Sequence, residues 1–107
     1  MKCRADANGG PCGYIIFYYN SSYDTAVKGI RLKSVANLGS YEYDEYPGVA
    51  GYGQGVKNNA AAAYNTSDYK CYVYYNSNYK GASDYIAPHS WRKLDKTYNE
   101  NASYRCS

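Results

Sequence analysis

The side chains that could carry catalytic chemistry are few in this chain. His89 is the single histidine in 107 residues, so a zinc site built on two histidines is excluded and a catalytic triad would depend on one candidate. It lies between Pro88 and Trp91, a setting typical of a turn residue beside a packed indole. Residues 51–55, Gly-Tyr-Gly-Gln-Gly, lack the Lys-Ser/Thr of a phosphate-binding loop. We therefore expect that the protein is not an enzyme.

Cysteine is the other reactive residue type, and its number indicates disulfides. Four cysteines in a small chain rich in Tyr, Asn and Gly are typical of a secreted protein, and none has the Cys-x-x-Cys spacing of a zinc or redox site. They are Cys3, Cys12, Cys71 and Cys106. If all four are paired, no thiolate nucleophile remains. We expect two disulfides, a secreted (extracellular) protein, and a Met1 that starts an expressed chain in place of a removed leader.

Tyrosine dominates the composition. The chain holds 17 Tyr against 13 Leu, Ile, Val and Phe together, yet its net charge of +3 is too small for a typical disordered chain. Tyr must therefore supply much of the core. Because each buried hydroxyl needs a hydrogen-bond partner, sheets and tight corners suit such a core better than helix bundles.

Tyrosines on the solvent side of a sheet suggest a binding function. Their rings could stack on sugars or bases, and nearby basic residues would favour an anionic partner such as a cell-wall polymer. The basic residues in question are Lys70, Lys80, Arg92 and Lys93. The alternative is a tyrosine core with scattered surface rings. The mild, interspersed charge argues against a nucleic-acid partner.

The chain contains an internal repeat. Residues 18–23, Tyr-Tyr-Asn-Ser-Ser-Tyr, recur as residues 74–79, Tyr-Tyr-Asn-Ser-Asn-Tyr, at a shift of 56. Residues 59–60 match residues 101–102 at a shift of 42, so the first half holds 14 extra residues, which we place at residues 40–53. The expected domain spans residues 1–107, with repeat 1 at about 13–66 and repeat 2 at about 69–106.

Local patterns predict an all-β fold. Residues 14–19 and 71–75 are short β-branched and aromatic runs that end in Asn and Ser. Residues 56–64 are the best helical candidate, but they correspond to strand-like residues 98–105 in the second repeat, so we predict strand or irregular structure there. Further short strands are expected around residues 30–35, 38–43, 83–86 and 93–98.

The second repeat carries a family signature. Tyr74-x4-Tyr79-x-Gly81-x-Ser83 resembles the Greek-key motif of the βγ-crystallins, in which the first aromatic packs across a folded hairpin, Gly adopts a positive φ, and Ser bonds across the hairpin. The corresponding residues of the first repeat are Tyr18, Tyr23, Thr25 and Val27. The resemblance implies a βγ-crystallin-like sandwich of two Greek-key repeats, stabilised by disulfides, with a less regular first hairpin.

The wider pattern looks like a secreted bacterial peptidase-inhibitor family with this fold, whose founder inhibits metalloproteinases, and like its killer-toxin-like relatives. The shared marks are an early cysteine pair and the Asn-rich Ala/Ser segments at residues 57–61 and 99–103. This resemblance implies a protein that binds and inhibits a peptidase through an exposed loop. The alternatives are an antimicrobial, killer-toxin-like protein that binds a cell-surface glycan, and a Ca²⁺-stabilised structural βγ-crystallin. We expect a monomer with no membrane span.

The extra residues 40–53 are the candidate binding loop. A Greek key does not need them, since the second repeat closes without them, so we expect that they can be deleted without loss of the fold. Tyr rings provide stiff contact area and carboxylates provide charge. The expected contact residues are Tyr41, Glu42, Tyr43, Asp44, Glu45 and Tyr46. The alternative is a tolerated surface insertion with no partner.

The resemblance also raises calcium and disulfide pairing. βγ-crystallin repeats often bind Ca²⁺ through Asn/Asp-Asn/Asp-x-x-Ser/Thr-Ser segments. The second repeat offers Asn99, Glu100 and Ser103, with Tyr104 at the sixth position. Residues 58–63 of the first repeat have lost both hydroxyls, so we expect these Asn residues to make structural hydrogen bonds and the protein to have no cofactor, with Ca²⁺ as the alternative. The expected disulfides are Cys3–Cys12 and Cys71–Cys106, the second joining the opening and closing strands of repeat 2.

Overall fold

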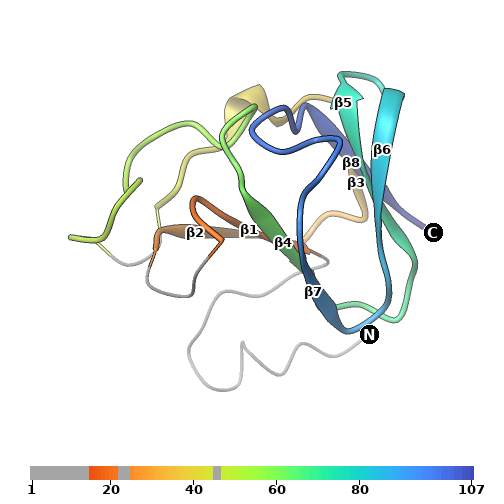
Figure 1. The fold of residues 1–107 in the computed structure, drawn as a ribbon, viewed down its shortest axis with the longest axis horizontal. Coiled ribbons are helices and arrows are strands. Elements are labelled where there is room, and N and C mark those ends of the chain that lie inside the picture. Colours follow the sequence, from red (N-terminus) through yellow and green to blue (C-terminus); the bar gives the residue numbers. More distant parts are fainter. Residues whose placement is uncertain (1–14, 22–24, 45–46) are drawn as a thin grey trace.

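The computed structural model describes residues 15–21, 25–44 and 47–107, and these form an all-β structure with one short 3₁₀ helix (Figure 1). The predicted all-β class is confirmed. The elements are β1 (Ile15–Tyr18), β2 (Val27–Ile30), β3 (Ser34–Val35), η1 (Leu38–Ser40), β4 (Ala62–Asn65), β5 (Cys71–Asn76), β6 (Lys80–Ile86), β7 (Ser90–Lys93) and β8 (Ser103–Cys106). Among these elements there is no helix long and apolar enough to cross a bilayer.

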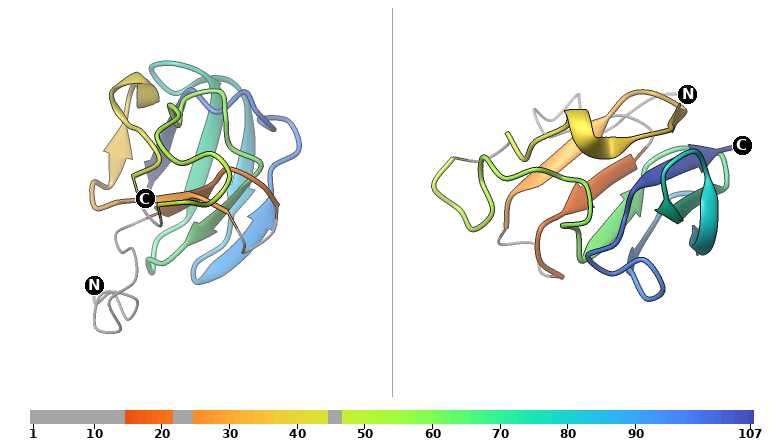
Figure 2. Two further views of the ribbon diagram at one scale, coloured as in Figure 1. Left: turned by 90° about the vertical axis from the view of Figure 1, so that its left-hand side faces the viewer. Right: turned by 90° about the horizontal axis from the view of Figure 1, so that it is seen from above.

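The strands form two four-stranded sheets that exchange one strand each (Figures 1 and 2). Sheet A has the order β2-β1-β4-β7, and sheet B has the order β3-β8-β5-β6. Strand β7 follows the second repeat's hairpin but pairs with β4, whereas β3 follows the first hairpin but pairs with β8. Each sheet therefore needs a strand from the other half of the chain.

Reciprocal hydrogen bonds relate the ends of the two repeats. Asn58 N donates to Asn101 O at 2.9 Å, and Asn99 N donates to Ala60 O at 2.9 Å. Asn58 and Asn99 also share a positive φ, of 56° and 54°. Equivalent residues here are thus offset by 41, from Asn58 to Asn99, which corrects the shift of 42 and makes the first repeat's insertion one residue longer than expected.

Two predicted strands are largely wrong, because a side chain folds the backbone into a turn in both places; of the first, only an isolated antiparallel bridge from Glu42 to Gly55 remains. In residues 38–43, Asn37 caps η1 by accepting a hydrogen bond from Gly39 N at 2.9 Å. In residues 93–98, the Asp84 carboxylate accepts hydrogen bonds from three consecutive backbone N–H groups. Asn and Asp side chains compete in this way with strand pairing. The prediction of strand or irregular structure at residues 56–64 is confirmed, since β4 begins at Ala62.

Tyrosine contributes to the core between the sheets, and each such ring brings a bonded hydroxyl. Tyr43 and Tyr104 are the largest fully buried side chains. The Tyr43 hydroxyl donates to Asn59 O at 2.7 Å, and the Tyr104 hydroxyl donates to Leu32 O. The Tyr104 ring also meets the Phe17 ring edge-on, with centroids 5.8 Å apart. These contacts satisfy the hydroxyl groups while the rings fill the core.

The predicted Cys71–Cys106 disulfide is present in sheet B. The two residues are direct cross-strand partners on β5 and β8, with Cα atoms 4.0 Å apart, and both are buried. The bond therefore clamps the two central strands of sheet B at one end. Cys3 and Cys12 lie outside the described residues, so their pairing stays a prediction.

Candidate functional site

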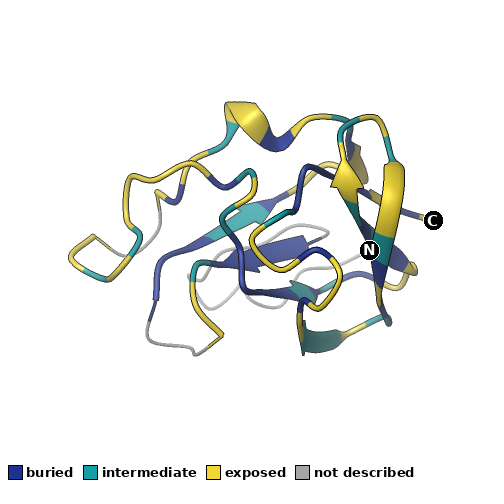
Figure 3. Cartoon of the chain, turned by 45° about the horizontal axis from the view of Figure 1, so that its top comes forward, coloured by how far each residue is buried: buried dark blue, intermediate teal, exposed yellow. Residues whose placement is uncertain are grey.

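The outer face of sheet B carries a concentration of tyrosine rings. Cys71 and Val73 of β5 belong to the core cluster, so alternation places Tyr72 and Tyr74 on the opposite, outer face. Both rings are half-buried, and the hairpin end of β5 and β6 is exposed (Figure 3). We use the name tyrosine face for Tyr72, Tyr74, Tyr79, Tyr85 and Arg105.

Strand register brings the central members of the tyrosine face together. Tyr72 lies opposite Tyr85 of β6 on one side and opposite Arg105 of β8 on the other. The Tyr72 and Tyr85 rings have centroids 5.2 Å apart and are tilted by 39°. Tyr85 is 40% exposed, so this pair presents aromatic surface to solvent. Arg105 is exposed beside it.

The β5–β6 hairpin folds Tyr79 back onto the same face. Asn78 and Tyr79 have φ of 63° and 61°, and Gly81 follows with φ of 85°, the left-handed conformation that favours glycine. The Tyr79 ring meets Tyr74 edge-on at 6.1 Å, and the Arg105 guanidinium lies 4.4 Å from the Tyr79 centroid. The Tyr74-x4-Tyr79-x-Gly81 signature thus describes a real contact.

The hydroxyl that fixes this hairpin to β8 belongs to Ser103. Its oxygen accepts a hydrogen bond from Tyr79 N at 3.1 Å and donates one to Asn76 O at 2.7 Å. Ser103 is fully buried. The backbone on which Tyr79 stands is therefore held from a neighbouring strand as well as by the local turn.

The exposed charged side chains on the strands of sheet B, Lys80 and Arg105, are positive. The only carboxylate on its four strands is Asp84, which is 3% exposed and faces inward, where it binds the N–H groups of residues 95–97 and the Thr97 hydroxyl. Burial alone would raise the pKa of Asp84, but the hydrogen bonds from Thr97, Asp95 and Lys96 outweigh it and lower the pKa. At the end of the face near the C-terminus, the Lys33 ammonium lies 4.4 Å from the Tyr69 ring centroid.

The basic residues named from the sequence are spread over both sheets. Lys80 begins β6 and is exposed. Arg92 donates to Tyr85 O at 3.1 Å and lies 3.7 Å from the Asp84 carboxylate, so part of its charge is neutralised. Lys93 is on β7 in sheet A. The sequence analysis missed Arg105. If Cys71 and Cys106 are partners on antiparallel strands, the residue before Cys106 lies opposite the residue after Cys71, so Arg105 lies opposite Tyr72.

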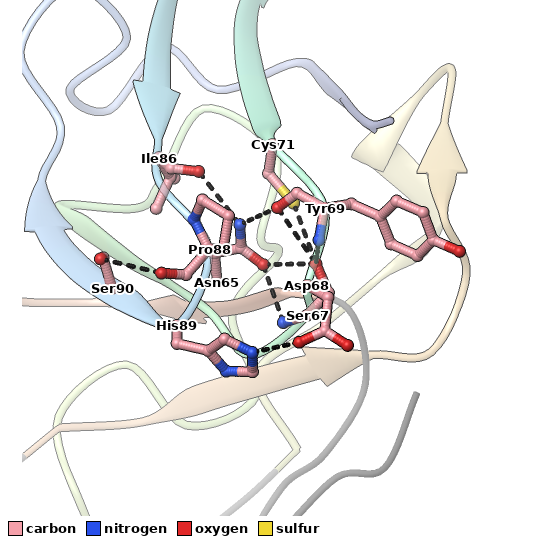
Figure 4. Close-up of polar contacts among 9 residues, drawn as sticks. All are labelled: Asn65, Ser67, Asp68, Tyr69, Cys71, Ile86, Pro88, His89 and Ser90. Carbon is pink, nitrogen blue, oxygen red and sulfur yellow. Dashed lines mark hydrogen bonds and ion pairs between the residues drawn. The ribbon is translucent and has the colours of Figure 1, made fainter.

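His89 pairs with Asp68 on the surface, at the end of sheet B that lies away from the β5–β6 turn (Figure 4). The imidazole Nε2 contacts Asp68 Oδ1, and both side chains are exposed. The two neighbouring hydroxyls donate elsewhere, Ser67 Oγ to Asn65 Oδ1 at 2.6 Å and Ser90 Oγ to Pro88 O at 3.1 Å. Neither serine is thus aligned as a nucleophile for the imidazole.

The buried amide of Asn65 explains this arrangement. Its Nδ2 donates to Tyr69 O at 2.6 Å and to Ile86 O at 3.0 Å, while its Oδ1 accepts from Ser67 N at 2.9 Å. One side chain therefore joins the β4–β5 loop to the end of β6, and the His89–Asp68 pair lies on the outside of that junction (Figure 4). These hydrogen bonds thus connect the β4–β5 loop to the last residue of β6.

The structure corrects the predicted binding loop at its centre. Tyr43 is fully buried in the core, so it cannot contact a partner, and Tyr41 is half-buried against the same cluster. Glu42 is exposed, and its backbone forms an antiparallel β-bridge with Gly55. The Asp44 carboxylate forms an ion pair with Lys28 at 3.0 Å. Glu45 and Tyr46 lie outside the described residues.

The insertion is also bonded to the rest of the fold, which argues against the expectation that it can be removed. Tyr43 N donates to Gln54 O at 2.8 Å, and Gly53 N donates to Tyr43 O at 2.7 Å. Ala50 O accepts from Ala26 N at 3.0 Å, which attaches the insertion to the residue before β2. The large ring of Tyr43 therefore fills part of the core from a segment that the second repeat lacks.

Two of the predicted calcium ligands, Glu100 and Ser103, already have protein partners. Ser103 holds the β5–β6 hairpin, and a hydrogen bond with Glu100, together with the charge of that carboxylate, raises the pKa of Tyr75. Tyr104, at the sixth position of the segment, is in the core. Within the described ranges, no three His, Cys, Asp or Glu side chains group as a metal site. A calcium ion prefers six to eight oxygen ligands, and the Ser103 hydroxyl is already bonded on both sides, so calcium binding there would compete with the hairpin.

Comparisons with known proteins support the fold. A βγ-crystallin domain from Flavobacterium johnsoniae is 22% identical and covers 88% of this chain and 93% of its own, with a TM-score of 0.59. A structure described under the evolution of the eye lens βγ-crystallin domain fold is 10% identical, covers 89% of this chain and 85% of its own, and has a TM-score of 0.66. The N-terminal domain of protein S is 14% identical, with coverages of 87% and 93% and a TM-score of 0.59.

No known protein family and no curated protein sequence matches the chain. The likeness to solved structures is below 25% in identity, so it concerns the arrangement of the backbone. The two four-stranded sheets with one exchanged strand each, the two related hairpins and the three similar structures all indicate the same fold. The protein is therefore an all-β protein with the βγ-crystallin fold.

Proposed function

We propose that this is a secreted glycan-binding protein that attaches to a cell-surface or cell-wall polysaccharide through the tyrosine face. The observation that carries the proposal is the Tyr72–Tyr85 ring pair, which lies on the outer face of sheet B with Arg105 beside it. The killer-toxin-like alternative from the sequence requires the same ability to bind a cell surface.

Sugar rings suit such a surface for an electrostatic reason. The face of a tyrosine ring carries partial negative charge, and the C–H groups on one side of a sugar ring carry partial positive charge, so the two stack. The tyrosine hydroxyls can then bond the sugar hydroxyls at the edge of the stack. Because a tyrosine has only two side-chain torsions, docking on it costs little conformational entropy.

The scaffold holds the rings in place before binding. Tyr72 follows Cys71, whose disulfide to Cys106 joins β5 to β8, and Ser103 fastens the hairpin that carries Tyr79. Both attachments are buried. A rigid sheet that presents paired rings is a preorganised site, and preorganisation increases affinity by lowering the cost of ordering.

Peptidase inhibition is the competing function, and the structure leaves it the exposed tip of the insertion. Tyr52 is 46% exposed there, whereas Tyr43 is buried in the core. The insertion that carries Tyr52 lies on the side of the structure away from β5 and β6, which carry the Tyr72–Tyr85 pair (Figure 1). Separate substitutions can therefore distinguish the two functions.

Retention on insoluble polysaccharides tests the proposal. We would measure the wild type, Tyr72→Ala/Tyr85→Ala and the control Tyr98→Ala, whose ring is 53% exposed outside the tyrosine face, on cellulose, chitin and bacterial cell walls. Retention of the wild type and the control, with loss in the double variant, is expected. Passage of the wild type through every polymer would overturn the proposal. So would inhibition of a peptidase panel that Tyr52→Ala removes and the double variant leaves intact.

A further inference from the structure

The tyrosine face combines aromatic rings with unbalanced positive charge. Among the described residues, Arg105 belongs to none of the ion pairs, which include those of Lys28, His89 and Arg92. The one carboxylate on the strands of sheet B, Asp84, faces the interior. A ligand on this face therefore meets cations and no competing acid from these strands.

Arg105 lies within the set of rings. Its backbone is opposite Tyr72, whose ring pairs with Tyr85, and its guanidinium is 4.4 Å from the centroid of Tyr79. Cross-strand neighbours on one face have Cβ atoms about 5 Å apart, so the Arg105 side chain begins beside Tyr72 and ends against the Tyr79 ring. Lys80 and Lys33 add exposed positive charge at the two ends of the sheet.

We infer that the polysaccharide bound by the tyrosine face is acidic, with carboxylates on its sugar rings, as in a polyuronate; this inference rests on the proposed function. A uronate carries its charge on the ring that stacks, so one sugar can occupy the Tyr72–Tyr85 pair and place its carboxylate against Arg105. A guanidinium presents two parallel N–H donors that match the two oxygens of a carboxylate. In a polymer linked by phosphates, the charge lies between the repeating units and is not fixed to a stacking ring.

Salt dependence separates the two parts of this site. The attraction between Arg105 and a carboxylate weakens as ionic strength rises, because exposed charges are screened over about 10 Å at 0.1 M salt. Ring stacking has no net charge and is much less sensitive. Polyuronate binding should therefore fall with added salt toward the level of the matching neutral polymer.

The experiment compares polygalacturonate with a neutral galactan of similar length, by titration against the wild type, Arg105→Gln, Arg105→Lys and Lys93→Gln. Lys93 is an exposed cation on the other sheet and is the matched control. We expect the wild type to bind polygalacturonate about tenfold more tightly than galactan in low salt, because a charge-assisted hydrogen bond contributes roughly that much. Arg105→Gln should lose this preference and keep galactan binding, Arg105→Lys should lose part of it, and Lys93→Gln should keep it.

Three results would overturn the inference. Equal binding of the two polymers, unchanged by Arg105→Gln, would leave a glycan-binding protein without the acidic preference. Tighter binding of a teichoic acid or of single-stranded RNA than of polygalacturonate would show that another anion is the ligand. Failure to bind galactan, polygalacturonate and cell walls alike would refute the proposed function itself.

Discussion

Replacing Tyr43 with Phe tests whether the insertion is part of the core. The substitution keeps the buried ring and removes the hydroxyl that donates to Asn59 O at 2.7 Å. Loss of one hydrogen bond that leaves a carbonyl without its donor costs about 1–2 kcal/mol. In a domain of this size each kcal/mol lowers the melting temperature by roughly 4–8 °C. Tyr52→Phe, which alters an exposed ring in the same insertion, should change neither quantity.

The effect of Tyr43→Phe should depend on pH in a defined direction. Burial, and secondly the nearby Tyr19, raise the pKa of the Tyr43 hydroxyl above its ordinary value. The unfolded chain releases this proton near pH 10, whereas the folded protein retains it, so the stability contributed by the neutral hydroxyl is complete below about pH 10 and declines above it. The decline amounts to about 1.4 kcal/mol per pH unit for one group. The wild type should therefore lose its advantage over Tyr43→Phe as pH rises from about 10 toward the pKa of the folded state.

Urea unfolding followed by circular dichroism at about pH 7 and about pH 11 measures both effects. The control is Tyr52→Phe at each pH. If Tyr43→Phe matches that control at neutral pH, and its stability falls with pH as steeply as that of the wild type, Tyr43 is not the buried hydrogen-bond donor that the structure places in the core.

Four further predictions follow from the same contacts. Cys71→Ala/Cys106→Ala should lower the free energy of unfolding by up to about 3.8 kcal/mol for a loop closed across 35 residues, measured by urea unfolding, and an unchanged midpoint would contradict it. Asp84→Asn should lower the free energy of unfolding by about 1–3 kcal/mol at neutral pH. Because the pKa of Asp84 is lowered in the folded protein, the wild type should lose this advantage as pH falls below about 4. A difference that stays constant in acid would be evidence against an ionised Asp84 in this turn. Deletion of residues 40–53 should abolish cooperative thermal unfolding, since it removes Tyr43, and a sharp transition in the deletion variant would restore the idea of a separable loop. Calcium followed by EDTA should leave the melting temperature unchanged, because Ser103 is already bonded on both sides, and an EDTA-reversible rise would disprove it.

The contacts that could be predicted are those between residues close in sequence or joined by the repeat. Tyr74, Tyr79 and Gly81 lie within one hairpin, so their spacing alone describes the turn and its ring contact. The cysteine pair could be predicted because one member opens the second repeat and the other closes it. Neither inference needed knowledge of how the two sheets meet.

The location of Tyr43 could not be read from its neighbours. Residues 42–45, Glu-Tyr-Asp-Glu, have the composition of an exposed loop, and tyrosine is suited both to surfaces and to cores. What decides is a long-range contact, since the hydroxyl reaches Asn59 and the backbone pairs with Gln54. The insertion thus contributes a buried side chain to the core from a segment that the second repeat lacks.

By itself, the sequence determined the all-β class, the two related Greek keys and the strand alternation that turns alternate tyrosines outward, because periodicity and hairpin chemistry act over a few residues. Only the tertiary structure decided which strands change sheets, which tyrosines are buried and which cation joins the exposed rings. Arg105 meets Tyr72 and Tyr79 across gaps of 33 and 26 residues, from Tyr72 to Arg105 and from Tyr79 to Arg105. Contacts of that separation depend on strand register and sheet order, which local sequence does not specify.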